Sequence, residues 1–508
     1  MKKVNRREFF EDSLFALAAA AAVSAAPVVA QERQPNAVSS NEKLGVAIVG
    51  MGGRSVNHVD AFVTDPRTIV LYLCDPDPRR GSPELLDKIA QRQGGIRPKY
   101  VADMRKTFED PAVDLVSCAA TNHWHTLCGL WALQHNKHCY LEKPISQNMH
   151  EGFALEAAIK KYGKIVQTGT QSRSDRAVVE ALAFIRSGGI GETRFSRGLC
   201  YKRRKTIGPK GNYPIPEGVD YDLWSGPAQI LPLTRKNFHY DWHWQREYGN
   251  GDIGNQGPHQ TDMARYFLDL DRYPNSVVSY GGRLGYQQEM KDDHYIDAGD
   301  TANTEVSIYD YGDKCIVFET RGLETPALFC PQGTEPQAAA KIGVLVYGSG
   351  GYLVYSPWEH CAAFDLDGRL IKLFKEGGDE LHFFNFIDAV VADDPSMLNA
   401  PAHVGVLSAA VSHMGNISYY LGENNKVSVS ELRSSLEKIK SLDDNLETLD
   451  RTVAHLEENG VDLDKTPLSL GPQLAFDPEK QVFDHSEAQK LTTRDYRAGY
   501  VVPDAAKI

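Results

Sequence analysis

The stretch that decides the fold is LGVAIVGMGGRS, residues 44–55. Its first six residues are an unbroken apolar run, which is typical of a strand buried on both faces of a parallel sheet. Gly50 permits a tight turn after that strand, and Gly52 lets the backbone approach an anion. A helix that begins near Gly53 points its N-terminal amides at the same place. This order predicts a site for the pyrophosphate of a dinucleotide, although Ser55 stands where a third glycine is usual.

An acidic residue ends the next predicted strand. Residues 69–74 are apolar and lead into Asp75, 25 positions after the first glycine of the turn. Folds of this type bind the hydroxyls of the adenosine ribose near that position. A carboxylate there favours NAD, because it repels the additional phosphate of NADP. Arg54, Arg79 and Arg80 keep NADP as an alternative, since arginines can hold that phosphate.

Strand and helix patterns alternate up to about residue 170. Apolar strand patterns recur at residues 114–119, 138–141 and 164–168, with helical patterns between them. Six parallel strands would complete a doubly wound α/β sheet. We therefore predict a nucleotide-binding Rossmann domain over residues 43–170.

Three polar motifs accompany this pattern. Residues 121–125 (TNHWH) and 142–144 (EKP) follow predicted strands, at the edge where open α/β sheets bind ligands. Residues 249–262 (GNGDIGNQGPHQTD) lead into a later helical pattern. Together with the glycine turn, these motifs resemble the Gfo/Idh/MocA oxidoreductase family over about residues 43–422.

The resemblance implies a second α/β domain with an open, mostly antiparallel sheet, which we place at residues 171–426. Two helical stretches, residues 380–393 and 404–421, are expected to pack on one face of that sheet. Short β-rich runs agree with the sheet and lie at residues 192–200, 275–284, 302–309, 314–320, 342–347 and 351–355. The expected cofactor-binding residues are Gly50, Met51, Gly52, Gly53, Arg54, Asp75, Thr121, Asn122, His125, Glu142 and Lys143.

The resemblance also implies where the acid–base chemistry lies. In the family, the lysine of the Glu-Lys-Pro motif, here Lys143, lies beside the nicotinamide and takes part in proton transfer. A partly desolvated lysine beside a positive ring has a lowered pKa, which suits this work. The family's Asp-x-Gly-x-His pattern reads Asn255, Gly257 and His259 in this chain. His259 can share the hydroxyl proton, whereas the amide of Asn255 orients a hydroxyl without taking its proton, so Asp252 is considered as a substitute.

An aromatic stretch, residues 238–244 (FHYDWHW), lies between these two motifs. Tyr240, Trp242 and Trp244 present flat faces that suit stacking on the C–H face of a sugar ring, and all three are predicted to bind substrate. Aromatic packing of a long loop is the alternative. No metal site is predicted at the histidines of this stretch, because no third ligand accompanies them. His413 resembles a motif of exported family members, and whether it reaches the pocket stays open.

The two ends of the chain carry further predictions. Residues 1–30 combine a basic start that includes Arg6 and Arg7 with an Ala-rich apolar stretch, which indicates a twin-arginine signal peptide, followed by a linker over residues 31–42. Residues 427–458 repeat leucines at spacings of three and four, which predicts one amphipathic helix. The rest of 427–508 reads as an extended arm that wraps its own domain or a neighbouring subunit.

Composition limits the class of function. The net charge of −12 argues against a nucleic-acid partner, and the eight cysteines show neither disulfide nor zinc spacing. Because free NAD is scarce outside the cytoplasm, an exported enzyme is expected to hold its cofactor tightly. The sequence therefore predicts an extracytoplasmic, NAD(P)-dependent oxidoreductase that acts on a CH–OH group of a carbohydrate, has no membrane span or metal, and forms a homo-oligomer through the sheet of its second domain. A redox-neutral glycosidase or lyase and a non-catalytic sugar-binding protein are the alternatives.

Overall fold

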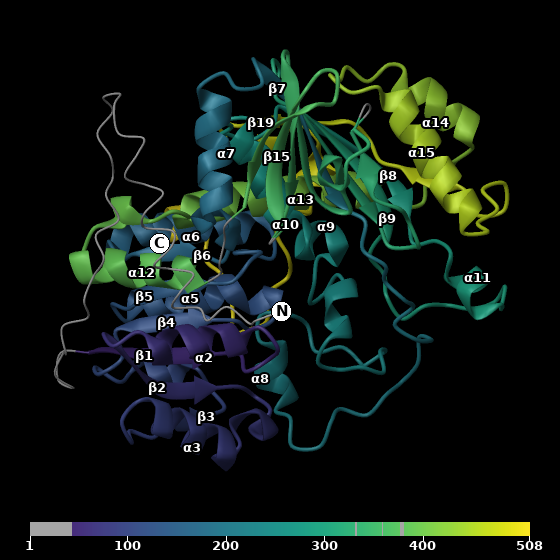
Figure 1. Ribbon diagram of the computed structural model, residues 1–508. Coiled ribbons are helices and arrows are strands. Elements are labelled where there is room, and N and C mark those ends of the chain that lie inside the picture. The colour runs from purple at the N-terminus through teal and green to yellow at the C-terminus, as the bar shows by residue number, and fades with distance from the viewer. Residues whose placement is uncertain (1–42, 331–332, 358, 376–379) are drawn as a thin grey trace, which may run out of the picture. The chain divides into compact units, whose positions relative to one another are not determined.

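The computed structural model describes residues 43–330, 333–357, 359–375 and 380–508 (Figure 1). The predicted signal peptide and linker, residues 1–42, lie outside the described residues. Within the described ranges, no helix has both the length and the apolar character needed to cross a bilayer.

The N-terminal domain is built on a parallel sheet of six strands, as predicted. The strand order is β3-β2-β1-β4-β5-β6, so the sheet is doubly wound from β1 outward. Its strands are β1 (Leu44–Val49), β2 (Thr68–Cys74), β3 (Lys99–Val101), β4 (Leu115–Cys118), β5 (His138–Leu141) and β6 (Val166–Thr168). Helices α2 (Ser55–Thr64), α3 (Pro83–Arg92), α5 (His125–Gln134) and α6 (Met149–Tyr162) connect them.

Local signals explain where these helices begin and end. Ser82 accepts a hydrogen bond from the Leu85 amide at the start of α3, and Pro83 occupies the first helical position, where its missing N–H costs nothing. Asn148 caps α6 in the same way, and α6 ends at Gly163, whose φ of 65° favours glycine. The start of α3 and both ends of α6 therefore follow from residues that are visible in the sequence, whereas α2 and α5 begin without a side-chain cap.

The second domain contains the predicted open sheet. Its main path runs β16-β15-β14-β13-β7-β10-β9-β8-β18-β17, and the pair β7–β10 is parallel while the other pairs along it are antiparallel. The six predicted runs form β7 (Thr193–Cys200), β8 (Ser276–Gly282), β9 (Thr304–Asp310), β10 (Cys315–Arg321), β13 (Ile342–Gly348) and β14 (Gly351–Ser356). Strands β15 (His360–Asp365) and β16 (Leu370–Phe374) were not predicted from the sequence.

The two predicted helices do not share one face of this sheet. Helix α13 (Ala402–Leu421) lies on the inner face together with α10 (Gly257–Phe267), and its Leu407 and Met414 join the main core. Helix α12 (Glu380–Ala392) instead packs on the Rossmann domain, where Phe383 stacks on Tyr140 with ring centroids 4.5 Å apart. The prediction was wrong for α12 because an apolar face shows that a helix is buried but not against which partner.

The residues after the second domain cover the other face of the sheet. Two helices, α14 (Val429–Leu436) and α15 (Asn445–Glu458), replace the single helix that was predicted. The helix is interrupted between Leu436 and Asn445. Leu442, which departs from the leucine spacing, lies in this interruption and is 48% exposed, and Asp444 then caps α15. Their leucines pack against Val278, Ile308, Val317 and neighbouring side chains of β8, β9 and β10. Figure 1 shows both helices, in yellow-green, beside these strands.

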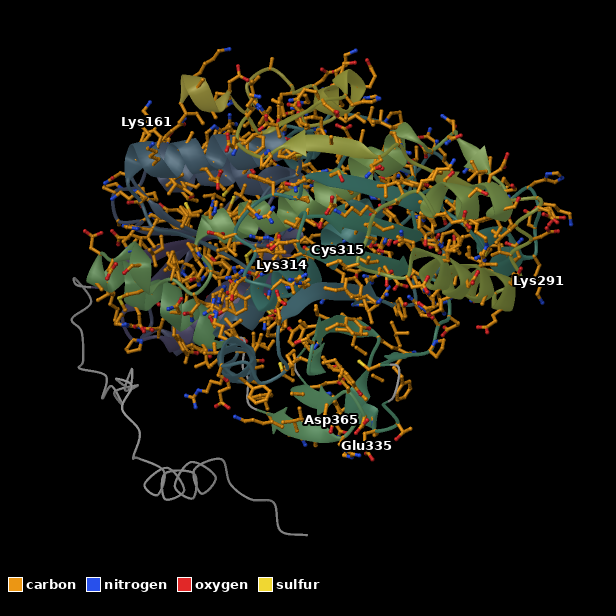
Figure 2. The ribbon with its side chains drawn as sticks, turned by 90° about the horizontal axis from the view of Figure 1, so that it is seen from above. Lys161, Lys291, Lys314, Cys315, Glu335 and Asp365 are labelled. Carbon is orange, nitrogen blue, oxygen red and sulfur yellow. The ribbon has the colours of Figure 1, made fainter. Side chains whose placement is uncertain are left out.

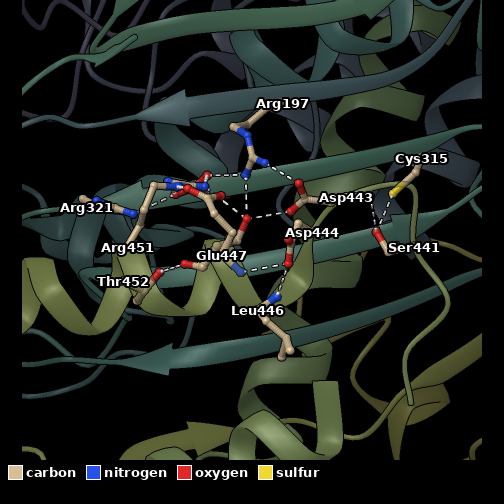
Figure 3. A network of polar contacts seen from close by, with 12 residues as sticks. Arg197, Cys315, Arg321, Ser441, Asp443, Asp444, Leu446, Glu447, Arg451 and Thr452 are labelled. Atoms are coloured by element: carbon tan, nitrogen blue, oxygen red, sulfur yellow. Dashed lines mark hydrogen bonds and ion pairs between the residues drawn. The ribbon is translucent and has the colours of Figure 1, made fainter. Parts of the chain in front are cut away.

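A buried ionic cluster fastens α15 to the sheet (Figure 3). Glu319 of β10 accepts hydrogen bonds from Arg451 at 2.9 and 3.0 Å, from Arg197 at 2.5 Å and from Arg321 at 3.0 Å. Burial alone would raise the pKa of Glu319, but the charges of these arginines hold it well below its usual range. Because α14 and α15 cover β8, β9 and β10, a partner that docked on this face would contact the two helices rather than the strands. Self-association through the sheet stays a prediction.

The remaining C-terminal residues wrap their own chain. Strands β18 (Leu468–Leu470) and β19 (Leu474–Asp477) pair with β8, and α16 (Ser486–Lys490) follows. Tyr500 and Val502 then enter the core of the Rossmann domain. The arm that the sequence left undecided therefore lies on its own chain.

All eight cysteines are buried free thiols. Cys315, at the start of β10, is 2% exposed, whereas Lys161 and Lys291 are exposed; Figure 2 labels all three. The burial of the thiols agrees with cysteines that serve as small apolar core residues.

Candidate active site

A cavity of about 390 Å³ lies where the carboxyl ends of the Rossmann strands face the second domain. One side is formed by the glycine turn, Asp75 and the segment after β4. The opposite side comes from a long irregular segment, residues 220–248, which we call the cavity wall. Lys143, Asn255 and His259 line the same cavity, so the structure brings the three predicted catalytic residues together.

The glycine turn fits a dinucleotide. Gly50 has a φ of 84°, and a Cβ at this position would lie 2.4 Å from the backbone of Ala120, so only glycine fits. In contrast, a Cβ at Gly52 or Gly53 would meet no atom within 4 Å, which leaves open space beside the first turn of α2. Backbone amides at that turn are suited to bind a pyrophosphate.

Asp75 holds the turn and also faces the cavity. Its Oδ2 accepts a hydrogen bond from the Met51 amide at 2.7 Å, and its Oδ1 accepts one from the Asp77 amide at 2.9 Å. Burial raises the pKa of Asp75 above its usual value, against the effect of these two amides. A carboxylate has further lone pairs, so ribose hydroxyls can still bind. Met51 itself does not line the cavity. Among the predicted arginines, Arg54 and Arg80 line it, whereas Arg79 pairs with Asp77.

The residues after β4 line the cavity but already have protein partners. Asn122 donates to Asn250 Oδ1 at 3.1 Å, and His125 contacts the carbonyls of Ala120 and Pro144 at 3.0 and 2.6 Å. Thr121 lines the cavity beside them. These side chains therefore shape the strand ends and fasten them to neighbouring segments.

Glu142, the neighbour of Lys143 in the sequence, is the centre of a buried polar cluster. It accepts hydrogen bonds from Arg54 Nε at 2.9 Å and Gln171 Nε2 at 2.9 Å, and His58 Nε2 is 3.2 Å away. Burial alone would raise the pKa of Glu142, but the charge of Arg54 and the contact with His58 hold it well below its usual range. Arg54 thus pairs with Glu142 while it lines the cavity.

Lys143 is the central polar group of the cavity. Its Nζ donates to the backbone carbonyl of Asn255 at 2.6 Å and to Asn255 Oδ1 at 3.2 Å. Burial lowers the pKa of Lys143 to about 8; Glu142 counteracts this, and the positive charges of Arg54 and Lys202 strengthen it. An amine with this pKa exchanges protons near neutral pH, as acid–base catalysis requires. Asn255, the residue that departs from the family pattern, therefore holds the lysine in place.

Two histidines beside Lys143 are neutral. Burial and, as the second cause, the charge of Lys143 lower the pKa of His259 to about 3. The same causes lower the pKa of His243 to about 3. The Nδ1 of His243 faces the Tyr240 carbonyl, which can only accept, so the proton lies on Nδ1 and Nε2 carries a lone pair.

The aromatic stretch divides between the cavity and the core. Tyr240 and Trp242 line the cavity, and Trp242 stacks on His243 with ring centroids 3.6 Å apart. Trp244 does not line it; it is 4% exposed and lies against Arg204. The prediction that Trp244 contacts substrate is therefore corrected, because its ring is buried against Arg204 rather than at the cavity surface.

Two further candidates lie away from the cavity. Asp252 is paired with Arg204 at 2.8 Å and is 1% exposed, so it is no substitute for the aspartate missing at position 255. His413, on α13, contacts the Ser146 carbonyl at 3.0 Å and does not line the cavity. Across the part of the chain that the structure describes, no group of three or more His, Cys, Asp or Glu residues is placed to hold a metal.

Several cavity residues were not predicted from the sequence. His239 and His243 had been considered only as metal ligands, yet both line the cavity, and His239 Nε2 lies 2.9 Å from Asp77 Oδ2. Leu223 and Trp224 of the cavity wall were not singled out at all. No local motif marks them, because they reach the site only through the path of a long loop.

Two family models match this chain. The model described as "Oxidoreductase family, NAD-binding Rossmann fold" matches residues 44–170, and "Oxidoreductase family, C-terminal alpha/beta domain" matches residues 195–296. Both belong to the Gfo/Idh/MocA family.

Curated proteins and solved structures include further proteins that are similar to this chain. Levoglucosan dehydrogenase of Pseudarthrobacter phenanthrenivorans is 25% identical over 244 residues, 47% of this chain and 54% of that protein. The scyllo-inositol 2-dehydrogenase (NAD(+)) of Bacillus subtilis is 29% identical over 153 residues, 30% of this chain and 43% of that protein. The chain thus spans about half the length of these curated relatives.

A solved structure of levoglucosan dehydrogenase in complex with NADH and levoglucosan matches with a TM-score of 0.53 at 17% identity. The match covers 73% of this chain and 96% of that one, and it shows a shared fold. Residues 44–170 and 195–296 of this chain are thus similar to the two domain models of the Gfo/Idh/MocA oxidoreductase family.

Proposed function

We propose that this chain is an NAD-dependent oxidoreductase that acts on a carbinol group of a sugar, a polyol or a sugar derivative. The observation that carries the proposal is the Lys143 amine, which has a pKa of about 8 and lines the same cavity as the glycine turn. The relatives named as sugar and inositol dehydrogenases support the substrate class. The carboxylate of Asp75 supports NAD over NADP.

Each residue then has a distinct role. Nicotinamide, when bound, supplies the acceptor for hydride from the carbinol carbon. Lys143 takes the hydroxyl proton, and Asn255 holds its Nζ in place. His259 is neutral, so it can accept or donate a hydrogen bond to the reacting oxygen. His243 offers its Nε2 lone pair to a second hydroxyl, and Tyr240 and Trp242 present flat faces to the ring.

We also propose that the chain is exported by the twin-arginine route and keeps its cofactor between turnovers. The basic start with Arg6 and Arg7 supports export. A retained cofactor would be reoxidised by a second substrate within the cycle. Replacing both arginines with lysine in a secreted-reporter fusion is expected to abolish export, and unchanged export would contradict this part of the proposal.

One experiment tests the function directly. The native holoenzyme is denatured, the released nucleotide is identified by mass spectrometry, and the intact protein is incubated with a carbohydrate panel while the absorbance of reduced cofactor is followed. We expect bound NAD and its reduction by at least one carbohydrate, with Lys143→Ala losing the reduction and keeping the nucleotide. Undiminished turnover in Lys143→Ala would contradict the mechanism. Sugar cleavage without net reduction would select the glycosidase or lyase alternative, and ligand binding without any reduction would select the sugar-binding alternative.

A further inference from the structure

The side of the cavity that faces the Rossmann domain is an irregular segment. The cavity wall, residues 220–248, contains only two short helical pieces, α8 (Tyr221–Ser225) and η5 (Asp241–Trp244). Its own small core includes Trp224, Phe238 and Tyr248. A segment without strand pairing gains little rigidity from backbone hydrogen bonds, so other contacts must hold it against the cavity.

A few contacts join the cavity wall to the Rossmann domain. Trp124 Nε1 donates to the carbonyls of Leu223 and Trp224, each at 3.1 Å. His239 of the cavity wall also contacts Asp77 directly, with Nε2 2.9 Å from Oδ2, and Asp77 lies in the loop that carries Asp75. A dinucleotide that occupies the cavity would lie beneath these contacts, so its release requires the wall to move away.

A second segment holds the wall at both ends. We call residues 492–502 the C-terminal arm. Arg494 of the arm pairs with the Glu247 carboxylate and donates to the Glu247 carbonyl at 3.0 Å. Arg497 pairs with Asp222 at 2.8 Å, and Tyr500 donates to the same carboxylate at 3.2 Å. Asp222 and Glu247 thus tie the first and last turns of the cavity wall to the arm.

The arm is itself anchored on the Rossmann domain. The His150 amide of α6 donates to the Thr492 carbonyl at 2.9 Å, and Tyr496 donates to Glu151 at 3.2 Å. Tyr500 is 7% exposed and packs edge-on against Trp124, with ring centroids 5.6 Å apart. The arm therefore connects the Rossmann helices α5 and α6 with the cavity wall.

We propose that the C-terminal arm is a strap that holds the cavity wall over the bound dinucleotide, with Arg494 and Arg497 as positioning residues that set the rate of cofactor release. The inference rests on the proposed function, in which the cavity takes NAD. Each ion pair by itself contributes little, but four contacts at two ends of one segment act together against its opening. This strap would let an enzyme keep its nucleotide where none is available for exchange.

The test uses a paired variant, Arg494→Gln with Arg497→Gln, which removes both charges and keeps much of the side-chain length. The matched control is Arg186→Gln, which breaks an exposed ion pair with Asp269 outside the cavity and the arm. Full-length holoenzyme loaded with NADH is mixed with excess NAD, and the loss of bound NADH fluorescence gives the release rate.

We expect NADH to be released at least tenfold faster from the paired variant than from wild type, and at the wild-type rate from the control variant. In the nucleotide-free state, the thermal midpoint of the paired variant should differ from wild type by no more than that of the control variant does. Arg494→Lys with Arg497→Lys should restore part of the slow release, because the charges return. An unchanged release rate, or faster release that tracks a lower thermal midpoint, would overturn the proposal.

A second measurement separates this inference from the proposed function. Hydrogen exchange of peptides from the cavity wall is compared in nucleotide-free wild type and the paired variant. Faster exchange in residues 220–248 of the variant supports the strap even if the cavity binds a ligand other than NAD. Equal exchange would overturn the strap, and a wild type that binds no nucleotide would overturn the proposed function instead.

Discussion

The pKa of Lys143 makes a quantitative prediction about pH. To take a proton from a hydroxyl, the amine must be unprotonated, and with a pKa of about 8 it is unprotonated in about one molecule in eleven at pH 7. The rate of hydride transfer should therefore rise about tenfold between pH 7 and pH 9, with its midpoint near pH 8. An ordinary lysine, with a pKa of about 10.4, would give a rise of about one hundredfold over the same interval and no plateau. His259 does not titrate there, because burial holds its pKa at about 3.

Two assays measure this midpoint independently. The first follows single-turnover reduction of the bound cofactor by a substrate from the carbohydrate panel, between about pH 6 and pH 10. The second needs no substrate: the rate of Lys143 acetylation is read by mass spectrometry over the same range, since only the free amine reacts. Both curves should have the same midpoint.

Removing a nearby charge should move the midpoint in a known direction. The positive charge of Lys202 lowers the pKa of Lys143, so Lys202→Gln is expected to move the midpoint to higher pH. Lys205→Gln is the matched control, because Lys205 is an exposed lysine in the same segment. A midpoint near pH 10 in both assays, or a kinetic midpoint near pH 8 that persists in Lys143→Ala, would refute the reasoning.

Three other perturbations have expected outcomes. Gly50→Ala forces a Cβ to within 2.4 Å of the Ala120 backbone, so NAD binding measured by calorimetry should be lost or weakened by more than about tenfold, and unchanged affinity would contradict the role of the turn. His243→Phe keeps the stacking on Trp242 but removes the hydrogen-bond acceptor. The KM for the parent sugar should therefore rise several-fold, whereas the KM for a deoxy analogue that lacks the bound hydroxyl should not change. Equal effects on both KM values would exclude the hydrogen bond. Glu305 is buried, with its pKa raised to about 8 by desolvation, so wild-type stability should fall as pH rises from about 4 to 8. Glu305→Gln should therefore be more stable than wild type by about 3 kcal/mol at pH 7 but by only about 1 kcal/mol at pH 5, and a constant difference in thermal midpoint at both pH values would contradict this assignment.

The sequence predicted those parts of the site that a short segment builds by itself. The glycine turn lies within residues 44–55, and its geometry depends on a positive φ and a close backbone approach at Gly50. Lys143 was predicted from the resemblance of its Glu-Lys-Pro motif to the family, and this motif directly follows a predicted strand, at the edge where open α/β sheets bind ligands. The six strands of the Rossmann sheet were likewise predicted, since continuous apolar runs and capping residues are local signals.

Contacts between distant segments could not be predicted in this way, because no local sequence pattern indicates them. Asp252 was a candidate base until the structure showed its pairing with Arg204, 48 residues earlier. His243 was considered as a metal ligand, and only its placement against Trp242 and the Tyr240 carbonyl showed a neutral acceptor in the cavity. Helix α12 was assigned to the wrong domain for the same reason.

The sequence by itself thus determined the fold class, the glycine turn and the position of the lysine that we propose for the acid–base chemistry, because each lies in a short motif of neighbouring residues. Only the tertiary structure decided that Asn255 holds this lysine, that α14 and α15 cover the outer face of the sheet, and that the C-terminal arm ties down the cavity wall. An amphipathic pattern shows that an apolar face must be buried, and a charged residue in the interior must be paired with an opposite charge. The partner depends on how segments hundreds of residues apart pack together, and no local pattern encodes that choice.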